Sequence, residues 1–218
     1  MNPQDKPNLH DMRVSYELGE LVEETAPASP IELFQGWLAD AVAHQLPEPN
    51  AMALATTGLD GFPCVRTVLL KQLDERGFSF FTNYESRKGQ ELARQPRAAL
   101  SFLWTARQRQ VCVRGTVQKL PRAEAESYFA MRPYGHQIGA WTSKQSETIP
   151  DRYWLEHRAK ELQKVFPEGQ PVPCPEFWGG YVLVPGEIEF WQGRPSRLHD
   201  RLRYRQVNGL WQQERLSP

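Results

Sequence analysis

The chain has 218 residues, 40% of them hydrophobic, and its formal net charge at pH 7 is zero. This length predicts one compact domain, and the neutral charge balance disfavours a nucleic-acid or membrane-surface partner. No apolar run has the length of a transmembrane helix, and the polar start lacks the apolar segment of a signal peptide, so we expect a cytoplasmic protein. Cys64, Cys112 and Cys174 are far apart in sequence, which favours free buried thiols over a disulfide framework or a metal site.

The first 29 residues predict an irregular, acidic arm, with six carboxylates against two cations. On composition alone, such an arm is expected to be disordered or loosely packed. Ser29-Pro-Ile-Glu32 then forms a capping box and predicts a helix that starts at Pro30 and ends near Leu46. Its apolar face would consist of Phe34, Trp37, Leu38, Ala41 and Val42.

From Ala51 onward the apolar residues recur with the period of β-strands. The predicted strands cover residues 51–57, 62–71, 78–82, 97–104, 109–120 and 177–184. Helices are predicted over residues 86–95, 121–131 and 151–166, the first capped by Ser86 and stopped by Pro96. Short strands joined mostly by hairpins, with helices between them, predict an antiparallel barrel of the α+β class.

The C-terminal stretch combines a short strand with a run of alternating cations. Ile188 and Phe190 indicate a strand, and residues 193–196 have the composition of a turn. Thereafter Arg197, His199, Arg201, Arg203 and Arg205 share one parity, and Leu198, Leu202 and Tyr204 share the other. This predicts a strand with a cationic face suited to an anionic planar ligand, although a solvated edge strand is an equal alternative. Asn208-Gly209 predicts a hairpin to a last strand over residues 210–216.

The usual signatures GxGxxG, GxxxxGK[ST], HExxH and GxSxG are missing from the sequence. Arg87 and Lys88 follow Ser86 at a predicted helix start, where free backbone N–H groups favour a phosphate. Tyr128 and Arg132 are four residues apart and, on one helical face, could bind a second phosphate. Two such clusters indicate two phosphorylated ligands side by side; the alternative is that these cations are ordinary solvated surface.

Several longer motifs stand in a fixed order along the chain. They are Arg66-Thr-Val-Leu-Leu-Lys71, Thr82-Asn83 with Ser86-Arg-Lys88, Arg109-Gln-Val111, Gln137-Ile-Gly-Ala-Trp-Thr-Ser-Lys-Gln-Ser146, Phe177-Trp-Gly-Gly180, and Phe190-Trp-Gln-Gly193 with Arg197-Leu-His-Asp-Arg201. Together they closely resemble the pyridoxine/pyridoxamine 5′-phosphate oxidases, a family of FMN enzymes that make pyridoxal 5′-phosphate. The resemblance runs from about Arg13 to the C-terminus.

The resemblance implies a split antiparallel β-barrel with flanking helices, assembled as a homodimer with FMN at the subunit interface. Residues 30–218 would form a single FMN-binding domain. Residues 1–29 would then be a flexible arm that covers the active site as a lid, which revises the expectation from composition.

The resemblance also implies roles for individual residues. FMN would be bound by Arg66, Thr67, Val68, Leu69, Leu70, Lys71, Phe81, Thr82, Arg87, Lys88, Gln110, Gln145, Ser146, Trp191 and Arg201, with Arg66, Arg87 and Lys88 at its phosphate. The substrate would be bound by Arg13, Val14, Ser15, Tyr16, Lys71, Tyr128, Arg132, His136, Arg197, Leu198 and His199, with Arg197 and His199 catalytic. His136 stands where the family often has a small hydroxyl residue, and Phe81 where a tyrosine is frequent.

The implied reaction is hydride transfer from C4′ of pyridoxine or pyridoxamine 5′-phosphate to FMN, with O2 as the final oxidant and H2O2 as a product. The amine substrate would also release ammonia. A flavin-binding protein without oxidase activity would lack the predicted substrate residues, which are present here. A nucleic-acid binder could use the C-terminal Arg, Tyr and Trp residues for stacking, but the net charge and the acidic arm disfavour it.

Overall fold

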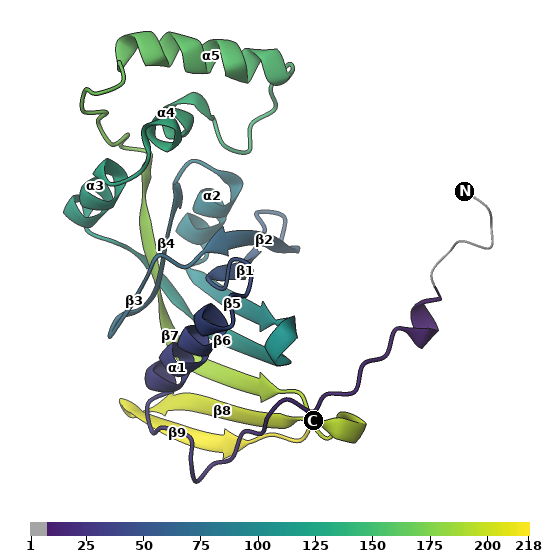
Figure 1. Cartoon of the computed structure of the whole chain (residues 1–218). Helices are drawn as coiled ribbons and strands as arrows, with labels where there is room; N and C mark the ends of the chain where they lie inside the picture. Colours follow the sequence, from purple (N-terminus) through teal and green to yellow (C-terminus); the bar gives the residue numbers. More distant parts are fainter. Residues whose placement is uncertain (1–7) are drawn as a thin grey trace.

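A computed structural model describes residues 8–218, and a curled antiparallel sheet runs through them (Figure 1). Its nine strands in this described part are β1 (Ala51–Thr57), β2 (Pro63–Leu69), β3 (Gln72–Asp74), β4 (Gly77–Asn83), β5 (Arg97–Trp104), β6 (Arg109–Lys119), β7 (Trp178–Gln192), β8 (Asp200–Val207) and β9 (Leu210–Arg215). The strand order is β2-β1-β5-β6-β7-β4-β3, and β8 adds to β7 and carries β9. The predicted split barrel of the α+β class is confirmed.

Helices flank this sheet on two sides (Figure 1). The α-helices are α1 (Pro30–Ala43), α2 (Arg87–Arg94), α3 (Arg122–Ala130), α4 (Tyr134–Thr142) and α5 (Arg152–Val165), and the 3-10 turns are η2 (Leu9–Asp11), η3 (Thr105–Arg107) and η4 (Pro195–Arg197). Within residues 8–218, every helix is too short or too polar to cross a membrane.

Helix α1 closes the main hydrophobic core. Ser29 caps it by accepting a hydrogen bond from the Glu32 backbone N–H, as the capping box predicts. The ring of Phe34 is fully buried and packs edge-on against Phe78 and Phe102, 4.9 and 4.7 Å away between centroids. Val42 does not belong to this apolar face, because 57% of its surface is exposed, and the helix ends at Ala43, before the predicted Leu46.

A second, smaller core lies at the other end of the sheet, under helices α3, α4 and α5. It is built from Phe129, Ile138, Val172 and Trp178. Helix α4 was not predicted, because Gly135 and Gly139 weaken the helical signal of its sequence. It is stabilised instead by packing, since Ile138 is buried against the first residues of β7.

Strand β7 is the longest of the sheet and connects the two cores (Figure 1). The strand predicted over residues 177–184 and the one indicated by Ile188 and Phe190 are a single strand, because a register shift opposite Arg114 and Gly115 takes up the extra residue. Its first half pairs with β4 and its second half with β8. One strand therefore carries side chains to both ends of the molecule.

The prediction of a continuous cationic strand from residue 197 is wrong at Arg197 and His199. Residues 195–197 form η4, with positive φ at Ser196 and Arg197, and β8 begins only at Asp200. The alternation holds within β8, where Leu202 and Tyr204 are buried. Of its cations, Arg203 and Arg205 share the Glu214 carboxylate on β9, at 2.5 and 2.6 Å, so both are ion-paired within the sheet. The predicted Asn208-Gly209 hairpin is confirmed.

The described part of the N-terminal arm has two sections. Figure 1 shows that the section that begins at Asn8 projects away from the body. The following section lies on the C-terminal strands: the Leu21 N–H donates to Asp200 Oδ2 at 3.0 Å, and the Tyr204 hydroxyl donates to the Pro27 carbonyl at 2.9 Å. The arm predicted over residues 1–29 is thus docked from about Tyr16; residues 1–7 lie outside the described residues.

Candidate functional site

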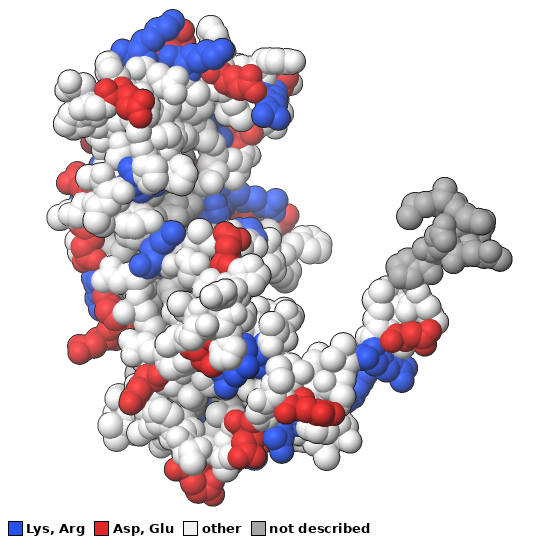
Figure 2. Space-filling model, viewed as in Figure 1, with Lys and Arg blue, Asp and Glu red and all other residues white. Residues whose placement is uncertain are grey.

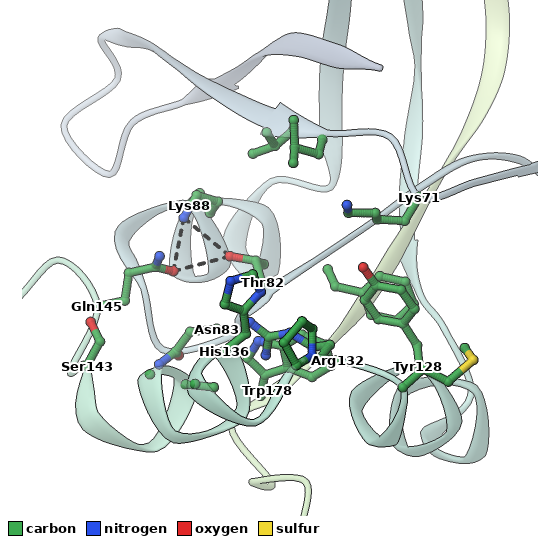
Figure 3. A pocket seen from close by; sticks show the side chains of 18 of the residues that line it. Lys71, Thr82, Asn83, Lys88, Tyr128, Arg132, His136, Ser143, Gln145 and Trp178 are labelled. Carbon is green, nitrogen blue, oxygen red and sulfur yellow. Dashed lines mark hydrogen bonds between the residues drawn. The ribbon is translucent and has the colours of Figure 1, made fainter. Parts of the chain in front are cut away.

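A cavity of about 800 Å³ opens between the sheet and helices α3 and α4 (Figure 3). Its lining includes Thr67, Val68, Leu69, Lys71, Phe81, Thr82, Lys88, Tyr128, Arg132, His136 and Gln145, all of which the sequence had suggested for FMN or substrate. Leu70 does not line it, because its side chain is buried in the main core. Strand β2, strand β4 and the α3–α4 region therefore bring most of the predicted residues together.

One cationic cluster lies where helix α2 begins. Ser86 caps the helix by accepting the Gly89 N–H at 3.3 Å. Lys88 Nζ lies 3.3 Å from Thr82 Oγ1 and 3.1 Å from Gln145 Oε1, and both contacts are drawn in Figure 3. Lys88 has no carboxylate partner within residues 8–218, and burial together with the neighbouring Arg66 lowers the pKa of Lys88. A helix start beside an unneutralised ammonium group suits a phosphate.

A buried carboxylate joins the other two predicted phosphate-binding cations. Glu91 is fully buried, and its Oε2 accepts from Arg66 Nη2 at 2.7 Å while its Oε1 accepts from Arg87 Nε at 3.0 Å. Thr56 adds a third donor at 2.6 Å. Burial alone would raise the pKa of Glu91, but hydrogen bonds from Thr56, Cys64 and Arg66 hold it below its ordinary value. Glu91 thus fixes Arg66 and Arg87 beside the start of α2.

A second cationic group lies across the cavity on a stack of aromatic rings. Phe81 stacks on Tyr128 at 4.1 Å and on Trp178 at 5.4 Å between centroids. The Arg132 guanidinium lies 4.7 Å above the Trp178 ring, and its Nη1 is buried without a hydrogen-bond partner in the described chain. Burial lowers the pKa of Arg132. Arg132 follows α3 rather than continuing it, so the predicted shared helical face with Tyr128 is wrong, yet both line the cavity.

The second cationic group consists of Lys71 and Arg132, and Figure 3 shows Tyr128 and His136 beside it. Lys71 follows β2, and its ammonium group has no salt-bridge partner within residues 8–218. A buried guanidinium N–H without an acceptor is costly, so the arrangement suits an anionic ligand that supplies oxygen atoms.

The remaining predicted residues lie elsewhere. Gln110, Trp191 and Arg201 line a smaller pocket of about 350 Å³ together with Cys112 and Glu189. Arg201 Nη2 pairs with Glu189 at 2.8 Å. The three cysteines are free but only partly buried, so the expected free thiols are confirmed and their full burial is not.

Next to this smaller pocket, the η4 turn presents His199 and Arg197. The His199 ring packs on Trp191 at 4.6 Å and on Tyr16 of the arm at 5.7 Å between centroids. Arg197 and Leu198 are exposed, and so are Arg13, Val14 and Ser15. Arg87 and Ser146 border a groove just outside the large cavity.

The two groups of residues lie far apart along strand β7. Trp178 lines the large cavity, and Trp191, thirteen residues further along the same strand, lines the smaller pocket. At about 3.3 Å per residue, the path between them is roughly 40 Å, longer than two small ligands in contact. Within one chain the predicted residues therefore form two separate groups, at opposite ends of β7 (Figure 1).

Three residues that support these two groups were not predicted as site residues. Trp178 forms the floor under Arg132, and Glu91 joins two cations. Gln108, at the η3 turn, accepts the Glu17 and Leu18 N–H groups at 2.9 and 3.1 Å and so holds the arm. The sequence held one weak signal for Glu91: Arg87 and Glu91 are four residues apart on a helix, a spacing that favours an ion pair.

Known proteins with similar sequences are pyridoxine/pyridoxamine 5′-phosphate oxidases. A family model described as pyridoxamine 5′-phosphate oxidase matches residues 38–166, and one described as the pyridoxine 5′-phosphate oxidase C-terminal dimerisation region matches residues 178–218. The pyridoxine/pyridoxamine 5′-phosphate oxidase of Pseudomonas paraeruginosa is 53% identical over 97% of this chain and 99% of its own. That of Synechocystis is 49% identical over 98% of this chain and 100% of its own.

Solved structures show the same fold. The crystal structure of PhzG from Burkholderia lata, in complex with tetrahydrophenazine-1-carboxylic acid, superposes with a TM-score of 0.85 at 34% identity, covering 91% of this chain and 98% of that one. An FMN-binding protein from Nostoc punctiforme, 17% identical, superposes with a TM-score of 0.69 over 88% of this chain and 100% of that one, which supports the fold alone. Taken with the two family models and the near-full-length relatives, these matches show that the chain belongs to the pyridoxine/pyridoxamine 5′-phosphate oxidase family.

Proposed function

We propose that this protein oxidises pyridoxine 5′-phosphate and pyridoxamine 5′-phosphate to pyridoxal 5′-phosphate with FMN as cofactor. The observation that carries this proposal is a single cavity with two separate unneutralised cationic groups. One is Lys88 at the start of α2, and the other is Lys71 with the partly buried Arg132. Cofactor and substrate each carry one phosphate, so the cavity offers one anion site to each.

The residues present fit FMN. Its phosphate would be held by Lys88, Arg66 and Arg87, of which the two arginines are already fixed by Glu91. Together these four side chains carry a formal charge of three minus one, or about +2, which matches a phosphate close to its dianionic form. The flavin would lie along Thr67 to Leu69 and over Thr82 and Gln145, which line the cavity beside Lys88.

The substrate phosphate would be held by Lys71, Tyr128, Arg132 and His136. Arg132 would give its unpaired Nη1 N–H to a phosphate oxygen, and the ring stack of Phe81, Tyr128 and Trp178 would keep that end of the cavity dry. Cofactor and substrate would then meet between the two phosphates. Holding both reactants in this way lowers the entropic part of the barrier.

When bound, FMN would supply the acceptor for a hydride from C4′ of the substrate, and O2 would restore its oxidised form with release of hydrogen peroxide. The protein would orient the substrate and exclude water. Arg197 and His199 would act at the reacting end, and Tyr16 of the arm, already packed on His199 and Trp191, would cover it.

Because Arg197, His199, Trp191 and Arg201 lie at the far end of β7, they would serve the cavity of a second copy. The match to a C-terminal dimerisation region over residues 178–218 supports a homodimer. With twofold symmetry, each of two equivalent sites would combine the large cavity of one chain with the β7–β8 end of its partner.

Two other functional classes fit the structure less well. On the face in Figure 2, positive and negative side chains are interspersed, and the β8 arginines are paired with glutamates, unlike the basic groove of a nucleic-acid binder. A flavin carrier without oxidase activity would not need the partly buried Arg132 on the far side of the cavity from Lys88.

Anaerobic spectroscopy tests the proposal. Purified protein should show the absorbance of oxidised flavin, and pyridoxine 5′-phosphate added without O2 should bleach it with formation of pyridoxal 5′-phosphate. Unphosphorylated pyridoxine should bleach it far less, because it lacks the group that Lys71 and Arg132 bind. Flavin that stays oxidised with both phosphate esters would refute the proposed activity.

A further inference from the structure

We propose that His199 acts only as a hydrogen-bond donor, through Nε2, and that the backbone N–H of Arg194 is the positioning group that fixes this role. The inference rests on the proposed function, since it assigns His199 a task in that reaction. It differs from the common expectation that a histidine near a reacting alcohol removes its proton.

The hydrogen bond at Nδ1 determines the form of the ring. The Arg194 backbone N–H points at His199 Nδ1 with an N···N distance of 3.1 Å. A backbone N–H can only donate, so Nδ1 must accept through its lone pair. A neutral imidazole with an unprotonated Nδ1 carries its hydrogen on Nε2.

The Arg194 backbone is itself held in place. Its side chain donates from Nη1 to the Gly19 carbonyl at 3.0 Å and pairs through Nε with Asp200 Oδ2 at 3.5 Å. The preceding residue, Gly193, donates its N–H to the Gln108 carbonyl at 2.7 Å. The two left-handed residues of η4, Ser196 and Arg197, turn the chain so that residue 199 returns to residue 194. The N–H is therefore a fixed donor.

The ring orientation is fixed as well. Trp191 lies 4.6 Å away at 45° and Tyr16 lies 5.7 Å away at 56°, so two aromatic rings contact the imidazole. Gly193 lets Tyr16 approach, since a Cβ at that position would lie only 2.8 Å from the Tyr16 ring. Nε2 makes no hydrogen bond to any residue from 8 to 218, and the side chain is partly exposed. The Nε2–H group is the part of His199 left for a ligand.

The chemical consequence follows from where the lone pair lies. To remove a proton at Nε2, the neutral ring would have to carry its hydrogen on Nδ1, where it would face the Arg194 N–H donor to donor. The structure favours the opposite arrangement, in which Nε2–H donates to an oxygen atom of the substrate and stabilises negative charge on it. Arg194, through its backbone, would then act as a positioning residue for this bond.

Nuclear magnetic resonance can observe this arrangement directly, without turnover. In the FMN-loaded protein labelled with [15N]histidine, long-range 1H–15N correlations identify which ring nitrogen carries the hydrogen, and His199→Gln assigns the signal. The neutral ring of His199 should be the Nε2–H form. A ring that carries its hydrogen on Nδ1 would overturn the proposal, whether or not the protein oxidises pyridoxine 5′-phosphate.

Kinetics of two substitutions provide the second test. A glutamine side chain can place its amide N–H near the position of Nε2 but cannot act as a base at neutral pH. His199→Ala should lower kcat/KM by about 10- to 100-fold, the usual effect of losing one hydrogen bond that can involve charge. His199→Gln should recover most of that loss, with FMN content equal in both variants. Equal impairment of the two variants would instead indicate a base and contradict the donor role.

Discussion

At the scale of single residues, the cavity depends on cations that lack carboxylate partners. Lys88 and Arg132 are both partly buried, and burial lowers the pKa of each. Such cations are tolerated where a ligand supplies the missing negative charge, and groups with perturbed pKa values in a cavity commonly mark functional sites. Arg203 and Arg205 show the opposite case, since both are ion-paired with Glu214.

Lys88 predicts how FMN affinity depends on pH. Because its pKa is lowered in the free protein, Lys88 loses its charge at a lower pH than an ordinary lysine. FMN affinity should therefore fall as pH rises from 7 toward 10, and it should fall less in Lys88→Arg, whose guanidinium stays charged. Flavin fluorescence titrations of both proteins over this range provide the measurement. Parallel pH curves would remove Lys88 from the phosphate site.

Glu91 predicts a stability effect. Glu91→Gln should lower the free energy of unfolding by about 3 kcal/mol, because removing one partner of a buried ion pair leaves charged donors unsatisfied. The donors here are Arg66 and Arg87, at 2.7 and 3.0 Å. Urea denaturation measures the change. The control, Glu126→Gln, removes an exposed pair with Arg122 and should change stability by less than about 0.5 kcal/mol.

These residues were not equally predictable from the sequence. The place of Arg87 and Lys88 at a helix start could be predicted, because Ser86 marks that start; their binding of a phosphate stays a prediction. Glu91 could not, since a carboxylate in a polar helix is usually solvated and only the fold buries it against β1 and β2. The motif resemblance suggested Arg132, but its place above Trp178 depends on a tertiary contact.

At the scale of elements, the arm and the η4 turn differ most from expectations based on local patterns. Alternation predicts a strand through Arg197 and His199, but Pro195 and the positive φ values of Ser196 and Arg197 form a turn there. Strands, helix starts and the Asn208-Gly209 hairpin were predictable from period, capping and turn chemistry. The docking of the arm was not, because it depends on Gln108 and on β8, which are distant in sequence.

The contact between Glu23 and Arg215 predicts how arm docking responds to acid. Two hydrogen bonds from Arg215 and its charge lower the pKa of Glu23 to about 2, from an ordinary value of 4.5. Its stabilising contribution is therefore complete above pH 4.5 and is lost as the pH falls toward 2. The wild type should melt above Glu23→Gln at pH 7, and this difference should close between pH 4.5 and 2.

A neighbouring residue supplies the control for this effect. Glu24 has no ion-pair partner within the described residues, so Glu24→Gln should leave the melting temperature nearly unchanged across the same pH range. A difference between wild type and Glu23→Gln that does not depend on pH would mean that the ion pair does not hold the arm.

At the scale of the whole molecule, strand β7 sets the architecture of the proposed site. It is long enough to place Trp178 and Trp191 roughly 40 Å apart along its path. In the proposed homodimer, a chain built in this way would present half of a site at each end, and twofold symmetry would complete both halves at once. The sequence motifs stand in the right order, but only the fold shows that they lie at two separate places.

Complementation between two inactive variants tests this account most directly. Arg132→Ala removes a cation from the large cavity, and His199→Ala removes a group from the β7–β8 end; each homodimer should oxidise pyridoxamine 5′-phosphate poorly. Heterodimers that carry one copy of each variant, isolated by two different affinity tags, contain one site with both residues intact. They should recover about half of the wild-type activity per dimer, because one of the two symmetric sites is restored. Heterodimers no more active than the two parent variants would contradict a site shared between chains.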